Sequence, residues 1–179
     1  MRGHGPTETV AALAMSESKQ LSDVRRVEDL YNDQILRFAG NIERIGRLGA
    51  ADATATSHSR LCGSTVTIDI IAQDETVTDF AHEVRACALG QASSSIMAKH
   101  IVGSTFDELL AVREVMYRML KHGGAPPSGR FGDLAALEPV RDYKPRHAST
   151  MLTFDAVADA IASIRARARD DDQKAAELA

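Results

Sequence analysis

The chain has 179 residues, of which 44% are hydrophobic and 26% are charged, and its formal net charge is −4. These values exclude a disordered chain, a collagen-like repeat and a disulfide scaffold. Nucleic-acid binding needs a basic surface, which this acidic chain does not suggest, and no apolar run reaches the roughly 18–20 residues that span a bilayer. We therefore expect a cytoplasmic protein with one main domain and with neither membrane nor nucleic acid among its partners.

Three segments of the chain differ in composition. Residues 1–24 mix small, polar and charged side chains without a sustained apolar stripe, which is typical of a flexible N-terminal extension. Residues 25–168 carry the regular apolar patterns of a folded domain. Residues 169–179 form a charged C-terminal tail, and we expect the chain to fray from Arg165 onward.

The first element expected in the domain is a helix. Apolar side chains recur at three- and four-residue steps from Val27 through Ile35 to Phe38, and the pattern stops at Gly40. This spacing places them on one face of an amphipathic helix.

Alternating side chains predict a β-hairpin after this helix. Thr65–Ile70 alternates strictly between polar and apolar residues, which is the period of a strand with one buried face. A polar turn at residues 73–75 leads into a second extended segment, Val77–Arg85. A further strand at Ala53–Ser59 would complete a three-stranded antiparallel sheet.

Helical patterns follow the hairpin. Good helix formers run from Leu89 to Ile101, and residues 105–108 match the capping box at the start of a second helix with a broad apolar stripe. Residues 123–129 are rich in glycine and proline and must form a loop. A last helix is expected around Phe154 and Ile161. The predicted fold class is α+β, a three-stranded antiparallel sheet packed against helices on one side.

The two cysteines, Cys62 and Cys87, are the chemically distinctive residues, because the sequence lacks the signatures of phosphate-binding loops, dinucleotide folds, zinc proteases and serine hydrolases. A reducing compartment disfavours a disulfide between them. Cys62 lies in the loop that enters the hairpin. Cys87 lies at a strand-to-helix junction, where the free N–H groups of a helix favour a reactive thiolate. Two inert, buried thiols are the alternative.

These cysteines lie in a pattern that is similar to the U-type iron–sulfur cluster scaffold family, which contains IscU, the N-terminal domain of NifU, and SufU. Cys62-Gly63 at a strand entry is followed by a hairpin and then by Cys87 opening a helix with the run Ser93–Ser95. The segment from Leu30 to Gly46 resembles the family's first helix and turn, and the segment from Gly132 to Arg146 resembles the approach to its third cysteine. The resemblance covers about residues 27–165.

The resemblance implies a site at which three cysteines and one aspartate converge to hold a [2Fe–2S] cluster or a zinc ion. By position, the first two cysteines fall on Cys62 and Cys87. The aspartate falls on Ser64 and the third cysteine falls on Ser149, so half of the implied ligand set is replaced by serine. Serine is a poor substitute, since its hydroxyl is neutral and is a harder ligand than a thiolate.

Other ligands are open at this stage. His147 is a better candidate than Ser149 or Ser64 for the third position, because neutral imidazole binds zinc and iron. His58 and His82 are weaker candidates of the same kind. Each of these histidines has a structural alternative, which for His147 is a surface position. A homodimer is a further alternative, in which two thiolates from each chain form a four-thiolate site.

We therefore interpret the chain as a scaffold or accessory protein of iron–sulfur cluster assembly that binds iron or a [2Fe–2S] cluster, or zinc, through an incomplete cysteine set, and that is not an enzyme. Its implied partners are a cysteine desulfurase and apo-acceptor proteins. One alternative is a sulfur relay, in which Cys87 accepts sulfur from the desulfurase. The other is a metal-free pseudo-scaffold that acts through protein interaction.

Overall fold

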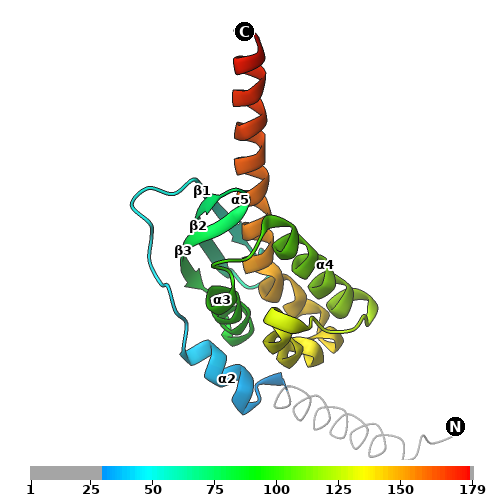
Figure 1. The fold of residues 1–179 in the computed structure, drawn as a ribbon. Coiled ribbons are helices and arrows are strands. Elements are labelled where there is room, and N and C mark those ends of the chain that lie inside the picture. The colour runs from blue at the N-terminus through cyan, green and yellow to red at the C-terminus, as the bar shows by residue number, and fades with distance from the viewer. Residues whose placement is uncertain (1–29, 178–179) are drawn as a thin grey trace, which may run out of the picture.

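The computed structural model describes residues 30–177 (Figure 1). The extension predicted for residues 1–24 and the helix start predicted at Val27 lie outside this range. The described elements, in chain order, are α2 (Asp33–Gly40), β1 (Ala53–His58), β2 (Thr65–Gln73), β3 (Thr76–Arg85), α3 (Ala88–His100), α4 (Phe106–His122), the 3-10 segment η1 (Gly129–Asp142) and α5 (Lys144–Glu177).

Helix α2 begins later than the apolar spacing predicts. Asn32 has an extended backbone, and its side chain accepts hydrogen bonds from the N–H groups of Gln34 and Ile35 at 3.1 and 3.0 Å. This is the geometry of a helix N-cap, which satisfies N–H groups that have no partner within the helix. The prediction of one helix that includes residues 31 and 32 was therefore wrong.

The three strands form one antiparallel sheet in the order β1-β2-β3, which confirms the predicted fold class. The hairpin between β2 and β3 turns at Asp74 and Glu75, whose φ angles are 49° and 56°. Two successive residues with positive φ give the turn that matches the twist of a hairpin. The capping box at Thr105 is also present, with Thr105 and Glu108 each accepting a backbone N–H from the other.

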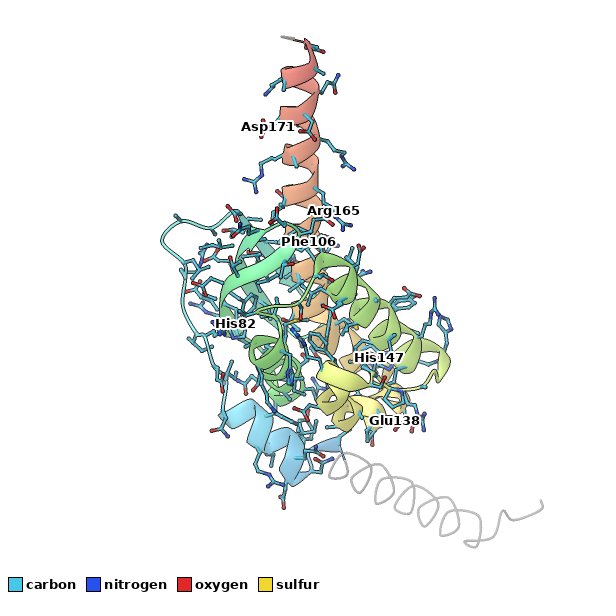
Figure 2. All side chains as sticks on the ribbon, viewed as in Figure 1. His82, Phe106, Glu138, His147, Arg165 and Asp171 are labelled. Carbon is cyan, nitrogen blue, oxygen red and sulfur yellow. The ribbon has the colours of Figure 1, made fainter. Side chains whose placement is uncertain are left out.

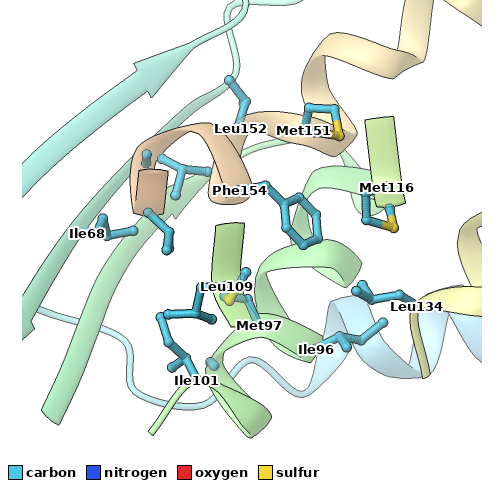
Figure 3. Close-up of a cluster of buried hydrophobic side chains, with 14 of the residues drawn as sticks. Ile68, Ile96, Met97, Ile101, Leu109, Met116, Leu134, Met151, Leu152 and Phe154 are labelled. Carbon is cyan, nitrogen blue, oxygen red and sulfur yellow. The ribbon is translucent and has the colours of Figure 1, made fainter. Parts of the chain in front are cut away.

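Helices α3 and α5 cover one face of the sheet, α4 and η1 pack on these helices, and α2 packs on α3 (Figure 1). Figure 3 shows Phe154 of α5 at the centre of this core, between side chains of α3, α4 and β2. Phe154 is 1% exposed, so the helix predicted around it is anchored by burial of a large ring. Among residues 30–177, no helix is long and apolar enough to cross a bilayer.

Helix α5 is longer than the sequence indicates, because it runs on to Glu177 where fraying was expected. Arg165 fixes it to the hairpin turn and to α4 by donating to Glu75 at 2.6 and 2.8 Å and to Asp107 at 2.9 Å. Its guanidinium also lies 5.7 Å from the centre of the Phe106 ring, and Figure 2 shows Asp171 farther out on the projecting part. Alanine, arginine, lysine and glutamate in this stretch are strong helix formers, which explains the extension.

The outer face of the sheet is held by one buried carboxylate. Asp69 on β2 is completely buried and accepts two hydrogen bonds from Arg47, at 2.7 and 2.9 Å. It also accepts from the N–H of Leu48 and the hydroxyl of Thr54. These donors, Arg47 first, lower the pKa of Asp69 from 3.8 to about 2. The network fastens the segment between α2 and β1 to the sheet.

We predict that Asp69→Asn lowers the free energy of unfolding by roughly 2 kcal/mol at pH 7, because the pKa shift is worth that amount and an amide cannot accept the same bonds. Since the folded-state pKa is depressed, this stability is fully present above the unfolded pKa of 3.8 and is lost as pH falls toward about 2. Urea unfolding between pH 2 and pH 7 measures both effects. Glu114→Gln, in an exposed pair with Arg118, is the control and should change stability by less than about 0.5 kcal/mol.

Candidate functional site

The sheet brings the two cysteines to the same end of the molecule. His58 of β1 and Arg85 of β3 both pair with Thr65 of β2, so the loop before β2 and the junction after β3 leave the sheet together. Cys62 lies in that loop, and Cys87 lies at that junction. Strand pairing therefore brings Cys62 and Cys87, which are 25 positions apart in the chain, to the same end of the sheet.

The loop that carries Cys62 is closed on itself. The N–H of Ser59 donates to the carbonyl of Ser64 at 2.8 Å, and the N–H of Gly63 donates to the carbonyl of Ser59 at 2.9 Å. Gly63 has φ 69°, a conformation that glycine adopts without strain. The turn leaves the side chain of Cys62 exposed, and its Sγ donates to Ser64 Oγ at 3.0 Å.

The surroundings of Cys62 favour its thiolate. Hydrogen bonds from the hydroxyl of Ser59, then of Ser64, lower the pKa of Cys62, and the charge of Arg146 acts in the same direction. Ser59 is only 3% exposed, and its Oγ has no hydrogen-bond partner of ordinary geometry within residues 30–177. A buried hydroxyl of this kind gains a strong acceptor when the neighbouring thiol loses its proton. The sequence pattern gave neither Ser59 nor Arg146 a role at Cys62, since the loop conformation brings Ser59 to the sulfur and the packing of α5 brings Arg146 near it.

Cys87 is the N-cap residue of α3, as predicted, and is half-buried. Its Sγ donates to Ser149 Oγ at 3.4 Å, and Ser149 Oγ in turn donates to the carbonyl of Arg146 at 3.0 Å. Each serine that stands at a family ligand position thus contacts one thiol, Ser64 beside Cys62 and Ser149 beside Cys87. Arg146 connects the two halves, through its charge at Cys62 and its carbonyl at Ser149.

A glycine makes the contact between α3 and α5 possible. A Cβ atom added to Gly90 would lie 2.9 Å from the carbonyl oxygen of Ser149 and 2.7 Å from the Cβ of Ala86. The first turn of α3 therefore approaches the backbone of α5 more closely than any side chain allows. This approach places Cys87 beside Ser149.

His147 is not brought to the thiols. It is buried, and its Nε2–H is directed to the carbonyls of Val140 and Arg141 at 3.1 and 3.0 Å, at the end of η1 (Figure 2). Burial lowers the pKa of His147, which favours the neutral ring. Residues two apart on a helix point about 200° apart, so His147 and Ser149 face different sides of α5. The surface position considered for His147 was wrong.

Of the two weaker candidates, one is engaged elsewhere and the other is an exposed side chain. His82 is buried and bonds through Nε2 to the carbonyl of Glu43 at 2.9 Å, and His58 is exposed at the end of β1. Within the described part of the chain, no group of three or more histidine, cysteine, aspartate or glutamate side chains is arranged to hold a metal ion. The possible metal ligands at this end of the sheet are therefore the two cysteine thiols and the two neutral serine hydroxyls beside them. Two of the four positions implied by the resemblance thus carry thiols, and the other two carry hydroxyls.

The fold and the site together define the class of this protein, a small α+β domain with two thiols at one end of a three-stranded sheet. The family model of the NifU-like N-terminal domain matches residues 30–169, and the chain belongs to that family. The predicted relationship to the U-type scaffolds is thereby confirmed.

Individual relatives agree with this assignment. A crystal structure of a nitrogen-fixing NifU-like protein (N-terminal) from Brucella abortus is 64% identical, with a TM-score of 0.77 over 78% of this chain and 97% of that chain. The iron–sulfur cluster assembly scaffold protein IscU of Thermotoga maritima is 24% identical over 135 residues, which are 75% of this chain and 94% of that protein. A crystal structure from Fervidobacterium islandicum AW-1 shares the fold, with 22% identity, a TM-score of 0.69 and coverage of 74% of this chain and 96% of that chain.

We predict that Gly90→Ala lowers the free energy of unfolding by about 1–3 kcal/mol, because the new methyl group forces α3 and α5 apart in a close-packed interface. Gly132→Ala is the matched control, since a Cβ there meets nothing within 4 Å, and its effect should be within about 1 kcal/mol of zero. Urea unfolding of both variants measures the difference. Equal stability of the two variants would contradict a tight contact at Gly90.

Proposed function

We propose that this protein is a scaffold of iron–sulfur cluster assembly that binds iron or a [2Fe–2S] cluster through the thiolates of Cys62 and Cys87. The observation that carries the proposal is the convergence of these two thiols at one end of the sheet in a member of the NifU-like N-terminal domain family. Relatives that match most of the chain are named as iron–sulfur cluster assembly scaffolds, which supports the same function.

In this proposal the cluster is cargo, held and passed on without catalytic turnover. Thiolates are the usual protein ligands of such clusters, and hydrogen bonds to the sulfurs tune the bound cluster. Ser64 Oγ lies 3.0 Å from the Cys62 sulfur, so we assign Ser64 to hydrogen bonding of that thiolate. Ser149 contacts the Cys87 sulfur while its own proton goes to the carbonyl of Arg146. Zinc is the competing metal for the same thiolates.

The partners in this proposal are a cysteine desulfurase, which supplies sulfur, and apo-proteins that accept the cluster. The site of action is the cytoplasm, whose reducing conditions keep the two cysteines as thiols.

We predict that the double variant Ser64→Asp/Ser149→Cys retains iron and sulfide at least 10-fold more tightly than the wild type, because it adds an anionic oxygen and a third thiolate beside the two present. Anaerobic reconstitution with iron and sulfide, followed by visible absorption and metal counting, measures the retention. Ser163→Cys/Gln73→Asp adds the same groups at exposed positions away from the site, the second at the hairpin end of the sheet, and serves as the matched control.

Three other results would each contradict part of this reading. Equal retention by wild type and double variant would mean that another ligand already completes the site. Equal gain in the control variant would mean that the added groups bind iron nonspecifically. No binding by either protein would favour a pseudo-scaffold that has kept the fold and a partner surface without the metal.

A second candidate function is sulfur relay, and the structure favours Cys62 for it over the Cys87 assigned from the sequence. Cys62 is exposed, and its pKa is lowered by the Ser59 and Ser64 hydroxyls, as expected of a reactive thiol. In the transfer, the Cys62 thiolate attacks the outer sulfur of the desulfurase persulfide. A new S–S bond forms on Cys62, the S–S bond of the desulfurase breaks, and the desulfurase cysteine leaves as a thiolate.

For this second candidate, we predict that incubation with a cysteine desulfurase and free cysteine adds the mass of one sulfur atom to the wild type and to Cys87→Ser. The Cys62→Ser variant should show no addition, because the remaining thiol is half-buried. Intact-protein mass spectrometry after rapid acid quenching measures the transfer. Addition to Cys62→Ser at the wild-type rate would assign the relay to Cys87.

A further inference from the structure

The sheet has two edges, and the chain covers them unequally. At the edge of β3, the carbonyl of His82 accepts from the N–H of Gly46 at 2.9 Å, and the N–H of His82 donates to the carbonyl of Arg44 at 3.0 Å. Near the hairpin, the N–H of Val77 donates to the carbonyl of Ser104 at 3.0 Å. Strand β1 pairs with β2 on one side, and within the described part of the chain no strand pairs with its other side.

Strand β1 lacks the features that keep an edge strand from pairing. Sheets block their edges with lysine, proline, bulges or inward-pointing charges. The sequence of β1 is Ala-Thr-Ala-Thr-Ser-His, without a lysine, a proline or a carboxylate, and its register with β2 is continuous from Ala53 to His58. An edge strand of this composition is a template on which another strand can pair.

The inner face of the sheet is also incomplete at β1. Ala55 and Ser57 lie on the face that the helices cover, where they pair with Ile68 and Val66 of β2, which are 0% exposed. Ala55 and Ser57 themselves are only partly buried. A further strand beside β1 would cover both side chains and continue the core.

The charges at the two ends of β1 indicate which strand fits there. Asp52 precedes the strand and Arg60 follows it, each exposed and each four positions from Thr56. The Asp52 carboxylate accepts from the N–H of Ala72 at 2.8 Å, and neither Asp52 nor Arg60 forms an ion pair within residues 30–177. In an antiparallel pair of two copies with a two-fold axis at Thr56, residue 52 of each copy lies opposite residue 60 of the other. A second copy therefore supplies the opposite charge at both ends.

The same axis matches the faces of the two strands. Residues equally far from Thr56 on either side differ by an even number of positions, so opposed residues lie on the same face of the sheet. Thr56 lies opposite Thr56 of the partner subunit, as it lies opposite Thr67 within the chain, where the two hydroxyls are 2.9 Å apart. Ala55 lies opposite the small Ser57 on the inner face. Within the strand no two charged side chains oppose each other, so like-charge repulsion is absent.

We propose that two copies of this chain pair through the open edges of β1, antiparallel about a two-fold axis at Thr56, so that two three-stranded sheets become one of six strands. The pairing involves neither Cys62 nor Cys87, and it goes beyond the scaffold function. Cys62 follows the His58 end of β1, and antiparallel pairing places the His58 ends of the two copies at opposite ends of the paired strands. Each copy therefore keeps its own thiol end free for other partners.

The strength of this dimer follows from the size of the contact. Backbone hydrogen bonds give the affinity when a strand is added to a sheet edge, and the side chains of β1 are small. Ion pairs between exposed side chains add little each and weaken as salt rises. We therefore expect a reversible dimer that dissociates on dilution and at high ionic strength.

The first test places a charge on the edge. In Thr56→Lys, two ammonium groups oppose each other across the axis, so the dimer should weaken roughly 10-fold. Thr67→Lys is the matched control, because it removes the same Thr56–Thr67 hydrogen bond and adds the same charge on the same face. It lies one strand inward, about 14 Å from its counterpart in the other copy, and should dimerise as the wild type does. Sedimentation velocity over a range of protein concentrations measures the three dissociation constants.

The second test exchanges the charges at the ends of the strand. Asp52→Arg and Arg60→Asp each place like charges opposite each other twice, so each variant alone should dimerise about 10-fold more weakly than the wild type. A mixture of the two variants should form a mixed dimer, since every opposed pair then has opposite charges, and the double variant should dimerise again. Native mass spectrometry resolves the mixed dimer by its mass, and circular dichroism shows that each variant is folded.

Hydrogen exchange locates the contact. In the wild type, the amides of β1 should exchange more slowly as protein concentration rises, and in Thr56→Lys this dependence should be lost. The variant Cys62→Ser/Cys87→Ser should dimerise as the wild type does, which separates this interface from any association through the thiols.

Several results would overturn the pairing of two copies. One is a wild type that stays monomeric at every concentration. Slow exchange of its β1 amides would then place another segment of the same chain on the edge, and fast exchange would leave the edge to an extended segment of another protein. Equal weakening by Thr56→Lys and Thr67→Lys, or no mixed dimer between the two charge variants, would place the contact elsewhere. None of these measurements depends on a metal, so the scaffold function stands or fails separately.

Discussion

The contact between α3 and α5 at Gly90 sets the positions of both halves of the site. Helix α3 continues directly from β3, and α5 lies across the same face of the sheet. Because no Cβ separates Gly90 from the backbone of Ser149, the starts of the two helices meet within van der Waals distance. The core around Phe154 then holds α5 in that position. The position of the two thiols at one end of the sheet therefore depends on helix packing as much as on strand pairing.

Serine occupies both positions at which the resemblance implies a further ligand, and each serine lies beside one thiol. Ser149 packs against the first turn of α3 through its backbone, and its hydroxyl lies beside the Cys87 sulfur. A serine hydroxyl differs from a thiol in remaining neutral, and it can donate a hydrogen bond. Each cysteine sulfur consequently has a serine hydroxyl beside it, and at Cys62 the neighbouring hydroxyls lower the pKa of the thiol.

The sequence predicted the elements whose signals are local. Strict alternation located β2, the capping box located α4, and the position of Cys87 before good helix formers located the start of α3. It failed where tertiary contacts decide. The apolar spacing predicted one continuous helix through residue 32, but Asn32 is the N-cap at which α2 begins. The charged stretch from Arg165 was expected to fray, but Arg165 bonds to Glu75 of the hairpin turn.

The site was predictable in part for the same reason. The cysteines and the serines at the family positions are visible in the pattern, so their pairing at one edge follows once the strands are paired. The orientation of His147 depends on the backbone carbonyl at the end of the 3-10 segment η1 that accepts its hydrogen bond. No periodicity in the sequence predicts that contact. The place of Ser59 depends on a six-residue loop that folds back on itself, and that conformation is set by backbone bonds rather than by side-chain pattern.

The length of α5 has a practical consequence. Helix α5 starts near the two thiols and ends at Glu177. Ser149 lies 28 residues before that end, which at 1.5 Å a residue is a distance of about 40 Å. A fluorophore or a surface linker attached at the far end would stand well clear of the sulfurs, on a rigid arm fixed at Arg165. Such an attachment offers a way to watch single molecules meet, exchange cargo and separate without touching the chemistry under observation.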